Sequence, residues 1–204
     1  IMHEDWTEFF LRDMLSKGIM SAEEVEVITK IILKDKSLGK EFSLIQDIIS
    51  SQLDADRLDY VLRDSHSCGV KYGAFDLEWL LNTLTPIQML DRKHLGITPK
   101  GIGVVEQYLL ARKHLYQHVY FHKKVVAANY LITLFIDQVF HLCRYDQATF
   151  KLIRKALSSR LASFFEAAAS ALESSLDKRK LMEALYPQYR LLQDYDIWIS
   201  IREV

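Results

Sequence analysis

Residues 42–64, FSLIQDIISSQLDADRLDYVLRD, contain the pattern that decides the fold class. Their apolar residues recur at the three- and four-residue spacing of an amphipathic helix: Leu44, Ile45, Ile48, Ile49, Leu53, Tyr60 and Val61. We therefore expect one long helix from residue 42 or 43 to residue 64. Its second half holds four aspartates in eleven residues. Aspartate is a poor helix former, so we expect these residues to serve something other than helix propensity.

The same spacing continues on both sides of this stretch and predicts a mostly α-helical fold. A capping-box pattern from Ser21 to Glu24 opens the helix before it. Downstream, Thr98-Pro99 is typical of a helix start. We expect helices over residues 3–16, 22–33, 75–84, 99–142 (one very long helix or two in line), 151–171 and 176–185, a loop over 65–73, one small β-hairpin near 86–98 and a mixed end over 186–204. We divide the chain into a partial helical domain, 1–142, and a C-terminal helical or mixed extension, 143–204.

Composition excludes several classes of protein. The chain has 204 residues with only 7 Gly and 3 Pro, too few for the many turns of a sandwich or barrel. Its net charge is -1, so neither nucleic acid nor a membrane is expected as a partner. The two cysteines, Cys68 and Cys143, lie far apart and predict neither a disulfide scaffold nor a thiolate zinc site. The apolar stretch 125–140 is too short to span a bilayer, and we expect a cytoplasmic protein.

The first candidate site lies in the second half of the quoted stretch. Asp56, Tyr60 and Asp64 are four residues apart, so on a helix they share one face. Gln52 would lie one turn earlier on that face, with Arg57 beside it. Asp59 and Arg63 would form an ordinary ion pair on another face. A charged surface helix explains the same pattern, and this alternative stays open.

The second candidate site lies in residues 111–124. Arg112, Tyr116 and Tyr120 share one helix face, and His114, His118 and His122 share the roughly opposite one. We expect the histidines to be capping or paired residues of a polar face, because ligands on one straight helix seldom complete a tetrahedral zinc site. Basic residues outnumber the single Glu106 on this predicted helix: Lys100, Arg112, Lys113, Lys123 and Lys124. Local positive charge of this kind suits a phosphate-rich ligand.

These runs carry a family resemblance that extends over nearly the whole chain. Gln-Leu-Asp-Ala-Asp-Arg-Leu-Asp-Tyr at 52–60, followed by Arg63-Asp64 and the runs at 69–73, 111–116 and 119–123, resembles the HD-domain metal-dependent phosphohydrolases, in their deoxynucleoside triphosphate triphosphohydrolase (dGTPase-like) branch. His3-Glu4 and residues 194–198 are similar to further segments of that branch. The resemblance implies a helical HD-domain-like bundle, a homo-oligomer, and cleavage of a dNTP to deoxynucleoside and triphosphate.

The resemblance also implies roles for single residues. Asp56 matches a catalytic metal ligand, and the metal would be Mn, Mg, Fe or Zn. The other matched residues would bind the substrate: Arg57 and Tyr60 near the phosphates, Asp64 at the sugar hydroxyl, Arg112 at a phosphate, Tyr120 beside sugar and base, His3 at the edge of the site, and Tyr116, which is a weaker match.

One departure from the family pattern limits these expectations. The first His and the His-Asp pair that name the family are absent, and a catalytic metal needs about three protein ligands. We therefore expect that this chain alone does not hold the metal and that it is a fragment or incomplete homologue of the enzyme. The abrupt ends of the sequence favour a fragment. The alternative is a non-catalytic helical module that binds nucleotides or mediates oligomerisation, and a nucleic-acid binder is the weakest reading.

Overall fold

The structure is a computed structural model that describes residues 3–35, 37–174 and 176–203, apart from the side chains of His3 and Glu4. Over these residues it contains eleven α-helices and one two-stranded antiparallel sheet, which confirms the predicted mostly α fold with one hairpin. The chain divides into two compact units, residues 18–126 and residues 1–17 with 127–204. We call them the hairpin unit and the helical unit and describe each by itself.

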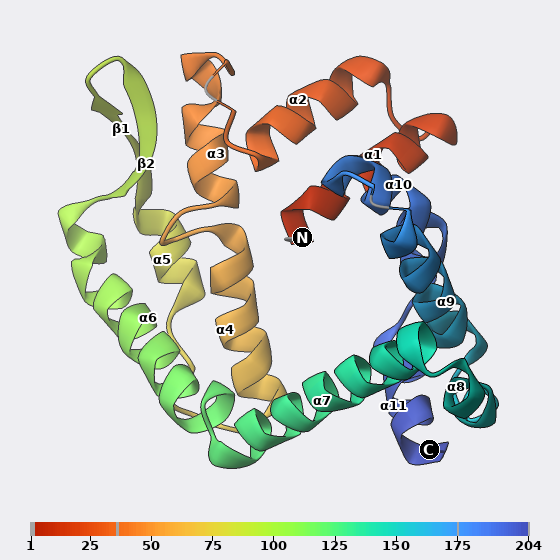
Figure 1. The fold of residues 1–204 in the computed structure, drawn as a ribbon. Helices are drawn as coiled ribbons and strands as arrows, with labels where there is room; N and C mark the ends of the chain where they lie inside the picture. Colours follow the sequence, from red (N-terminus) through yellow and green to blue (C-terminus); the bar gives the residue numbers. More distant parts are fainter. Residues whose placement is uncertain (1–2, 36, 175, 204) are drawn as a thin grey trace. The chain divides into compact units, whose positions relative to one another are not determined.

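The hairpin unit is built from short helices around the hairpin. Its elements are α2 (Ala22–Ile32), the 3-10 turn Lys40–Phe42, α3 (Ser43–Ile49), α4 (Ala55–Ser67), α5 (Leu77–Thr83), β1 (Leu84–Met89), β2 (Arg92–Ile97), the 3-10 turn Pro99–Gly101, α6 (Ile102–Leu115) and the π-helical turn Tyr116–Tyr120. The hairpin register runs from Leu84 opposite Ile97 to Met89 opposite Arg92. Figure 1 shows α3 beside the hairpin and α4 beside α6, and both pairs of elements are in contact.

The core of the hairpin unit lies between α4, α5 and α6. Its fully buried side chains include Val61, Leu80, Tyr108 and Leu115. The hydroxyl of Tyr108 donates a hydrogen bond to the carbonyl oxygen of Gln52 at 3.0 Å. A buried phenol needs such a partner, and this one ties α6 to the segment that precedes α4.

The helical unit contains α1 (His3–Ser16), most of α7 (Lys123–Tyr145), α8 (Gln147–Ile153), α9 (Ser159–Glu173), α10 (Lys178–Tyr189) and α11 (Asp194–Glu203). One core cluster gathers around Phe150 and Phe165. A second joins α1 to α9 and α10, where the Trp6 ring stacks on Tyr189 with centroids 4.0 Å apart.

The prediction of one long helix over residues 42–64 is wrong, because α3 ends at Ile49 and α4 begins at Ala55. Asp54 is the N-cap of α4, and its carboxylate accepts hydrogen bonds from the backbone N–H groups of Arg57 at 2.7 Å and Ser51 at 3.1 Å. The hydroxyl of Ser51 also accepts the N–H of Leu53. Short polar side chains compete with the helix for backbone groups in this way and break it. Gln52 therefore lies in the break and not on the helix face.

Several other boundaries differ from the predictions. The expected helix 151–171 is two helices, because Ser158 caps α9 with its hydroxyl on the N–H of Leu161. The end, expected to be mixed, is helical in α11, and α4 continues to Ser67 into the predicted loop. The helix expected over 99–142 is interrupted by the π-helical turn. The domain division expected at residue 142 does not coincide with the two compact units and, as a statement about domains, stays a prediction.

Helix α7 extends beyond the apolar stretch 125–140 that seemed too short for a bilayer. With 23 residues it is long and apolar enough to cross a membrane by length and composition alone, although it carries Asp137 and Arg144. Buried core helices of soluble proteins meet the same two criteria, but only 6% of the apolar window of α7 is buried; it is the one helix of this kind in the described part of the chain. This single helix is no clear sign of a membrane protein, and the cytoplasmic location stays a prediction.

Candidate functional site

Five of the predicted site residues come together in the hairpin unit. They are Tyr60 and Asp64 on α4 and Arg112, Tyr116 and Tyr120 at the end of α6 and in the π-helical turn. We call this group the Arg-Tyr cluster. It is composed of one cation, one carboxylate and three phenols, all partly buried.

Side-chain hydrogen bonds connect the two sides of the Arg-Tyr cluster. The hydroxyl of Tyr120 donates to Oδ2 of Asp64 at 2.5 Å, across 56 positions of sequence. The guanidinium Nε of Arg112 donates to the hydroxyl of Tyr60 at 3.3 Å, across 52 positions. Both bonds involve a charged group, and the first, which is much shorter, is the stronger of the two.

Ring contacts complete the Arg-Tyr cluster. The ring of Tyr120 meets that of Tyr60 edge to face, with centroids 6.3 Å apart, and that of Tyr116 with centroids 5.0 Å apart. The guanidinium carbon of Arg112 lies 5.4 Å from the Tyr116 ring centroid, a cation-π distance. An open pocket of about 300 Å³ adjoins these residues, lined by Leu109, Arg112, Lys113 and Tyr116.

The environment moves the pKa values of the three phenols in different directions. Burial and the hydrogen bond to Asp64 raise the pKa of Tyr120 far above its usual value of 10.0, because both disfavour a phenolate. Burial likewise raises the pKa of Tyr60. Hydrogen bonding with Tyr60 and then with Arg112 lowers the pKa of Tyr116. Burial lowers the pKa of Arg112, but its hydrogen bonds to Tyr116 and Tyr60 outweigh burial and raise it overall.

The π-helical turn sets the position of Tyr120. In an α-helix each N–H bonds the carbonyl four residues earlier, whereas the N–H of Phe121 bonds the carbonyl of Tyr116, five residues earlier, at 2.9 Å. The wider turn rotates every following side chain relative to α6. The turn thereby places Tyr120 against Asp64, a position that a straight continuation of α6 does not predict.

The remaining predicted residues lie outside the Arg-Tyr cluster. Asp56 is exposed in the first turn of α4, one turn before Tyr60 on the predicted face. Arg57 is engaged at the start of the same helix, where it donates to the carbonyl oxygen of Ser51 and its Nε lies 3.6 Å from Oδ2 of Asp54. The side chain of His3 lies outside the described residues.

A metal ion does not fit the carboxylate of Asp56 with the ligands that the described residues supply. No group of three or more His, Cys, Asp or Glu side chains in the described part of the chain could hold a metal ion. Asp56 would contribute one exposed carboxylate where about three protein ligands are needed. The expectation that this chain alone does not hold the metal stays a prediction.

The predicted ion pair of α4 is confirmed, whereas the three histidines predicted to share one face have different surroundings. Nε of Arg63 lies 3.0 Å from Oδ2 of Asp59, and both side chains are exposed. His122 follows the π-helical turn, where its Nδ1 accepts the N–H of Lys124 at 3.3 Å, a local capping role. His114 and His118 instead face the ring of Tyr72.

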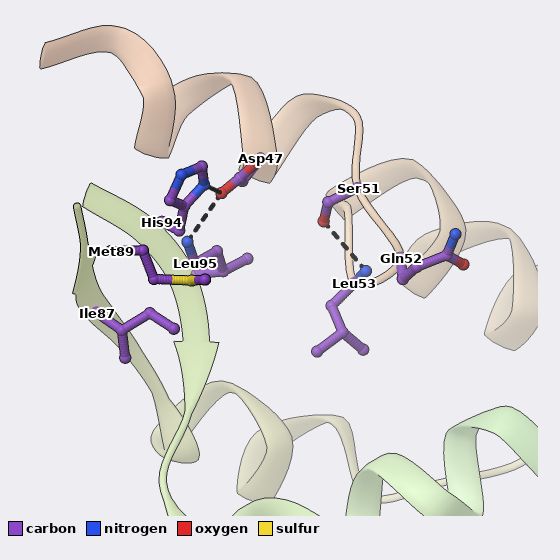
Figure 2. A pocket seen from close by; sticks show the side chains of 8 residues that line it. All are labelled: Asp47, Ser51, Gln52, Leu53, Ile87, Met89, His94 and Leu95. Carbon is purple, nitrogen blue, oxygen red and sulfur yellow. Dashed lines mark hydrogen bonds and ion pairs between the residues drawn. The ribbon is translucent and has the colours of Figure 1, made fainter. Parts of the chain in front are cut away.

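A second pocket, of about 420 Å³, lies between α3 and the hairpin (Figure 2). Oδ2 of Asp47 lies 2.9 Å from Nδ1 of His94 and accepts the N–H of Leu95 at 3.0 Å. Figure 2 shows Ser51 on the other side of the pocket from His94, with its hydroxyl on the N–H of Leu53, so it does not extend the Asp-His pair into a hydrolase triad. The pair therefore fastens β2 to α3.

Sequence reasoning missed Asp54, Tyr72, and the pair of Asp47 and His94. Of these residues, only Asp54 could have been found from the sequence, because aspartate is a preferred N-cap residue directly before a helix. Asp47 and His94 are 47 positions apart, and no periodicity links them.

Comparison with known proteins yields uncharacterized relatives. The chain is 32% identical to the uncharacterized protein MJ1154 of Methanocaldococcus jannaschii over 167 residues, which are 81% of the chain and 36% of that protein. It is 38% identical to the uncharacterized protein YwfO of Bacillus subtilis over 89 residues, 44% of the chain and 20% of the relative. No family model matches. The chain spans about a third or less of the length of these curated relatives.

Proposed function

We propose that the chain belongs to a metal-dependent phosphohydrolase of the HD family that hydrolyses a dNTP to deoxynucleoside and triphosphate, and that the Arg-Tyr cluster binds the nucleotide. The observation that carries the proposal is the hydrogen-bonded meeting of Tyr60, Asp64, Arg112 and Tyr120 from two segments more than 50 positions apart. The sequence resemblance independently matches each of these residues to a nucleotide contact.

The chemistry of the Arg-Tyr cluster suits the three parts of a nucleotide. Arg112 offers a guanidinium beside an open pocket, the geometry that recognises phosphate oxygens. The phenol rings offer apolar faces with a polar tip for sugar and base. Asp64 uses Oδ2 for Tyr120, while its Oδ1 has no hydrogen-bond partner within the described residues and can accept one from a sugar hydroxyl.

In this proposal the ligands that complete a metal site at Asp56 come from outside the described residues. Homo-oligomerisation, a cytoplasmic location and the absence of nucleic acid as a partner belong to the same proposal. A non-catalytic nucleotide-binding module would use the same Arg-Tyr cluster and would release no product.

Nucleotide binding by the 204-residue chain tests the role of the Arg-Tyr cluster. Calorimetric titration with each dNTP should show binding that Arg112→Gln weakens, because a hydrogen bond to a charged group contributes about 1.5–3 kcal/mol, or roughly 10- to 150-fold in affinity. Arg63→Gln is the matched control, since Arg63 is exposed and pairs only with Asp59 among the described residues. Equal affinities for the two variants would contradict the proposed site.

Hydrolysis separates the two functions. The chain is incubated with each dNTP and Mn²⁺, and deoxynucleoside and triphosphate are sought by chromatography. Product that disappears in Asp56→Ala supports the hydrolase. Binding without product in this chain favours the non-catalytic module, and the Asp56→Ala variant of a full-length relative then decides whether Asp56 is needed for turnover.

A further inference from the structure

We propose that His114 at the end of α6 and His118 in the π-helical turn form a chelating site for a borderline divalent transition-metal ion such as Zn²⁺. The site is separate from Asp56 and does not rest on the proposed function. Two imidazoles four residues apart on a helix can bind one ion, and imidazole suits Zn²⁺, Cu²⁺ and Ni²⁺.

The geometry of the two rings permits chelation without movement of the backbone. Their centroids are 6.2 Å apart. Because a Zn–N bond is about 2.0–2.1 Å long, two rings that bond one ion cannot have centroids much farther apart than this. Neither ring makes a hydrogen bond or ion pair with the described residues, so the nitrogen lone pairs are available. His122 differs, because the N–H of Lys124 already occupies its Nδ1.

Tyr72 forms the third side of the site. Its ring meets His114 at 5.9 Å and His118 at 5.6 Å between centroids, edge to face in both cases. The three residues line an open pocket of about 430 Å³, which leaves room for water or an incoming ligand at the remaining coordination positions.

The loop that carries Tyr72 is fixed in place. A Cβ added to Gly73 would lie 2.6 Å from Cβ of Ser65 and 3.2 Å from Cδ1 of Leu115, so backbone and helices approach closely there. The hydroxyl of Ser65 also donates to the carbonyl of Val70 at 2.6 Å. Leu115 directly follows His114, so this packing holds the loop against the same end of α6.

The π-helical turn is the second structural sign of a site. His118 lies within it and His114 just before it. π-Helical turns are rare and occur frequently at functional sites. An ion held by His114 and His118 would bridge α6 and this turn, and would therefore rigidify the segment that also carries Tyr116 and Tyr120.

The test is zinc titration of the chelator-treated 204-residue chain in a Cys68→Ser background, because the exposed thiol of Cys68 can itself bind zinc. We expect one ion per chain, with an affinity that falls at least tenfold in His114→Gln and in His118→Gln. The sharper variant combines Gln117→His with His114→Gln, which keeps the histidine count and leaves the two imidazoles at adjacent positions, where side chains on a helix do not face each other. It should lose the ion to the same extent.

The control and a second measurement decide the outcome. His66→Gln, an exposed histidine of α4, should bind zinc as the unchanged chain does. Zinc should also slow amide exchange in residues 116–122 of the unchanged chain and not in the variant with the moved histidine. If that variant binds zinc with unchanged affinity, or if His66→Gln weakens binding as much as His118→Gln, the proposed site is wrong.

Discussion

Replacement of Asp54 by alanine should destabilise α4 by about 2–3 kcal/mol. Asp54 is 5% exposed, and its carboxylate accepts backbone hydrogen bonds from Arg57 and Ser51 and pairs with the Arg57 side chain. Loss of an N-cap costs about 1 kcal/mol and at most about 2, and the second buried hydrogen bond adds about 1 kcal/mol. Asp76→Ala is the matched control, because Asp76 is an exposed N-cap of α5 with one such bond, to the N–H of Trp79.

The assay is hydrogen exchange followed by mass spectrometry, which reports each helix without assuming that the two compact units unfold together. A loss of 2–3 kcal/mol should speed exchange in residues 55–67 by roughly 30- to 150-fold, whereas Asp76→Ala should speed exchange of α5 by less than about tenfold. Asp54→Asn should fall between, since the amide still caps but does not pair with Arg57. If Asp54→Ala has no larger effect than Asp76→Ala, the break between α3 and α4 and its cause are both wrong.

Two further predictions concern the close packing beside α6 and the titration of the Arg-Tyr cluster. Gly73→Ala should destabilise the hairpin unit by roughly 1–3 kcal/mol, because the added Cβ would overlap the buried Ser65. Gly103→Ala should instead stabilise the unit by up to about 1 kcal/mol, because the space around the added Cβ in α6 is open. Urea unfolding measures the stability of both variants, and equal changes in stability would contradict the close packing at Gly73. The folded pKa of Tyr120 is raised, so the folded state holds a proton that the unfolded state loses, and the stability contributed by Tyr120 is present below pH 10.0 and falls as pH rises above it. Tyr120→Phe should therefore flatten the loss of stability above pH 10.0 in urea unfolding, whereas Tyr130→Phe, which changes an exposed tyrosine, should leave that loss as it is. Identical alkaline profiles for the two variants would argue against the half-buried hydrogen bond to Asp64.

The helices that were predicted well begin with patterns formed by residues close together in the sequence. Ser21 and Glu24 form the predicted capping box: the Ser21 N–H donates to the Glu24 carboxylate at 2.8 Å, and the Glu24 N–H donates to the Ser21 hydroxyl at 3.2 Å. The hairpin was also readable, since apolar residues flank a polar turn. The prediction of a continuous helix over residues 42–64 failed because the apolar stripe persists across the break. The residue that indicates the break is Asp54, which caps the start of α4.

The candidate site was predictable only in part, for reasons of geometry. Helical spacing correctly placed Asp56, Tyr60 and Asp64 in one helix, because that relation is local. The contact of Tyr120 with Asp64 spans 56 positions and depends on a π-helical turn, which hydrophobic spacing does not encode. Tyr72 could not be found at all, since its contacts with His114 and His118 depend on how the loop after α4 folds back on α6.

The π-helical turn holds one residue more than an α-helical turn needs to span the same stretch of helix. Deleting the exposed Gln117 would let the turn close as an ordinary α-helix in which Phe121 follows Tyr116 by four residues and bonds the same carbonyl oxygen, so the residues that follow keep their rotation about the helix axis. Most side chains at position 117 would be harmless, because they would point into solvent. In a library of variants, deletion of Gln117 should therefore be depleted far less than deletion of a single residue within α6, which rotates all that follows by about 100°.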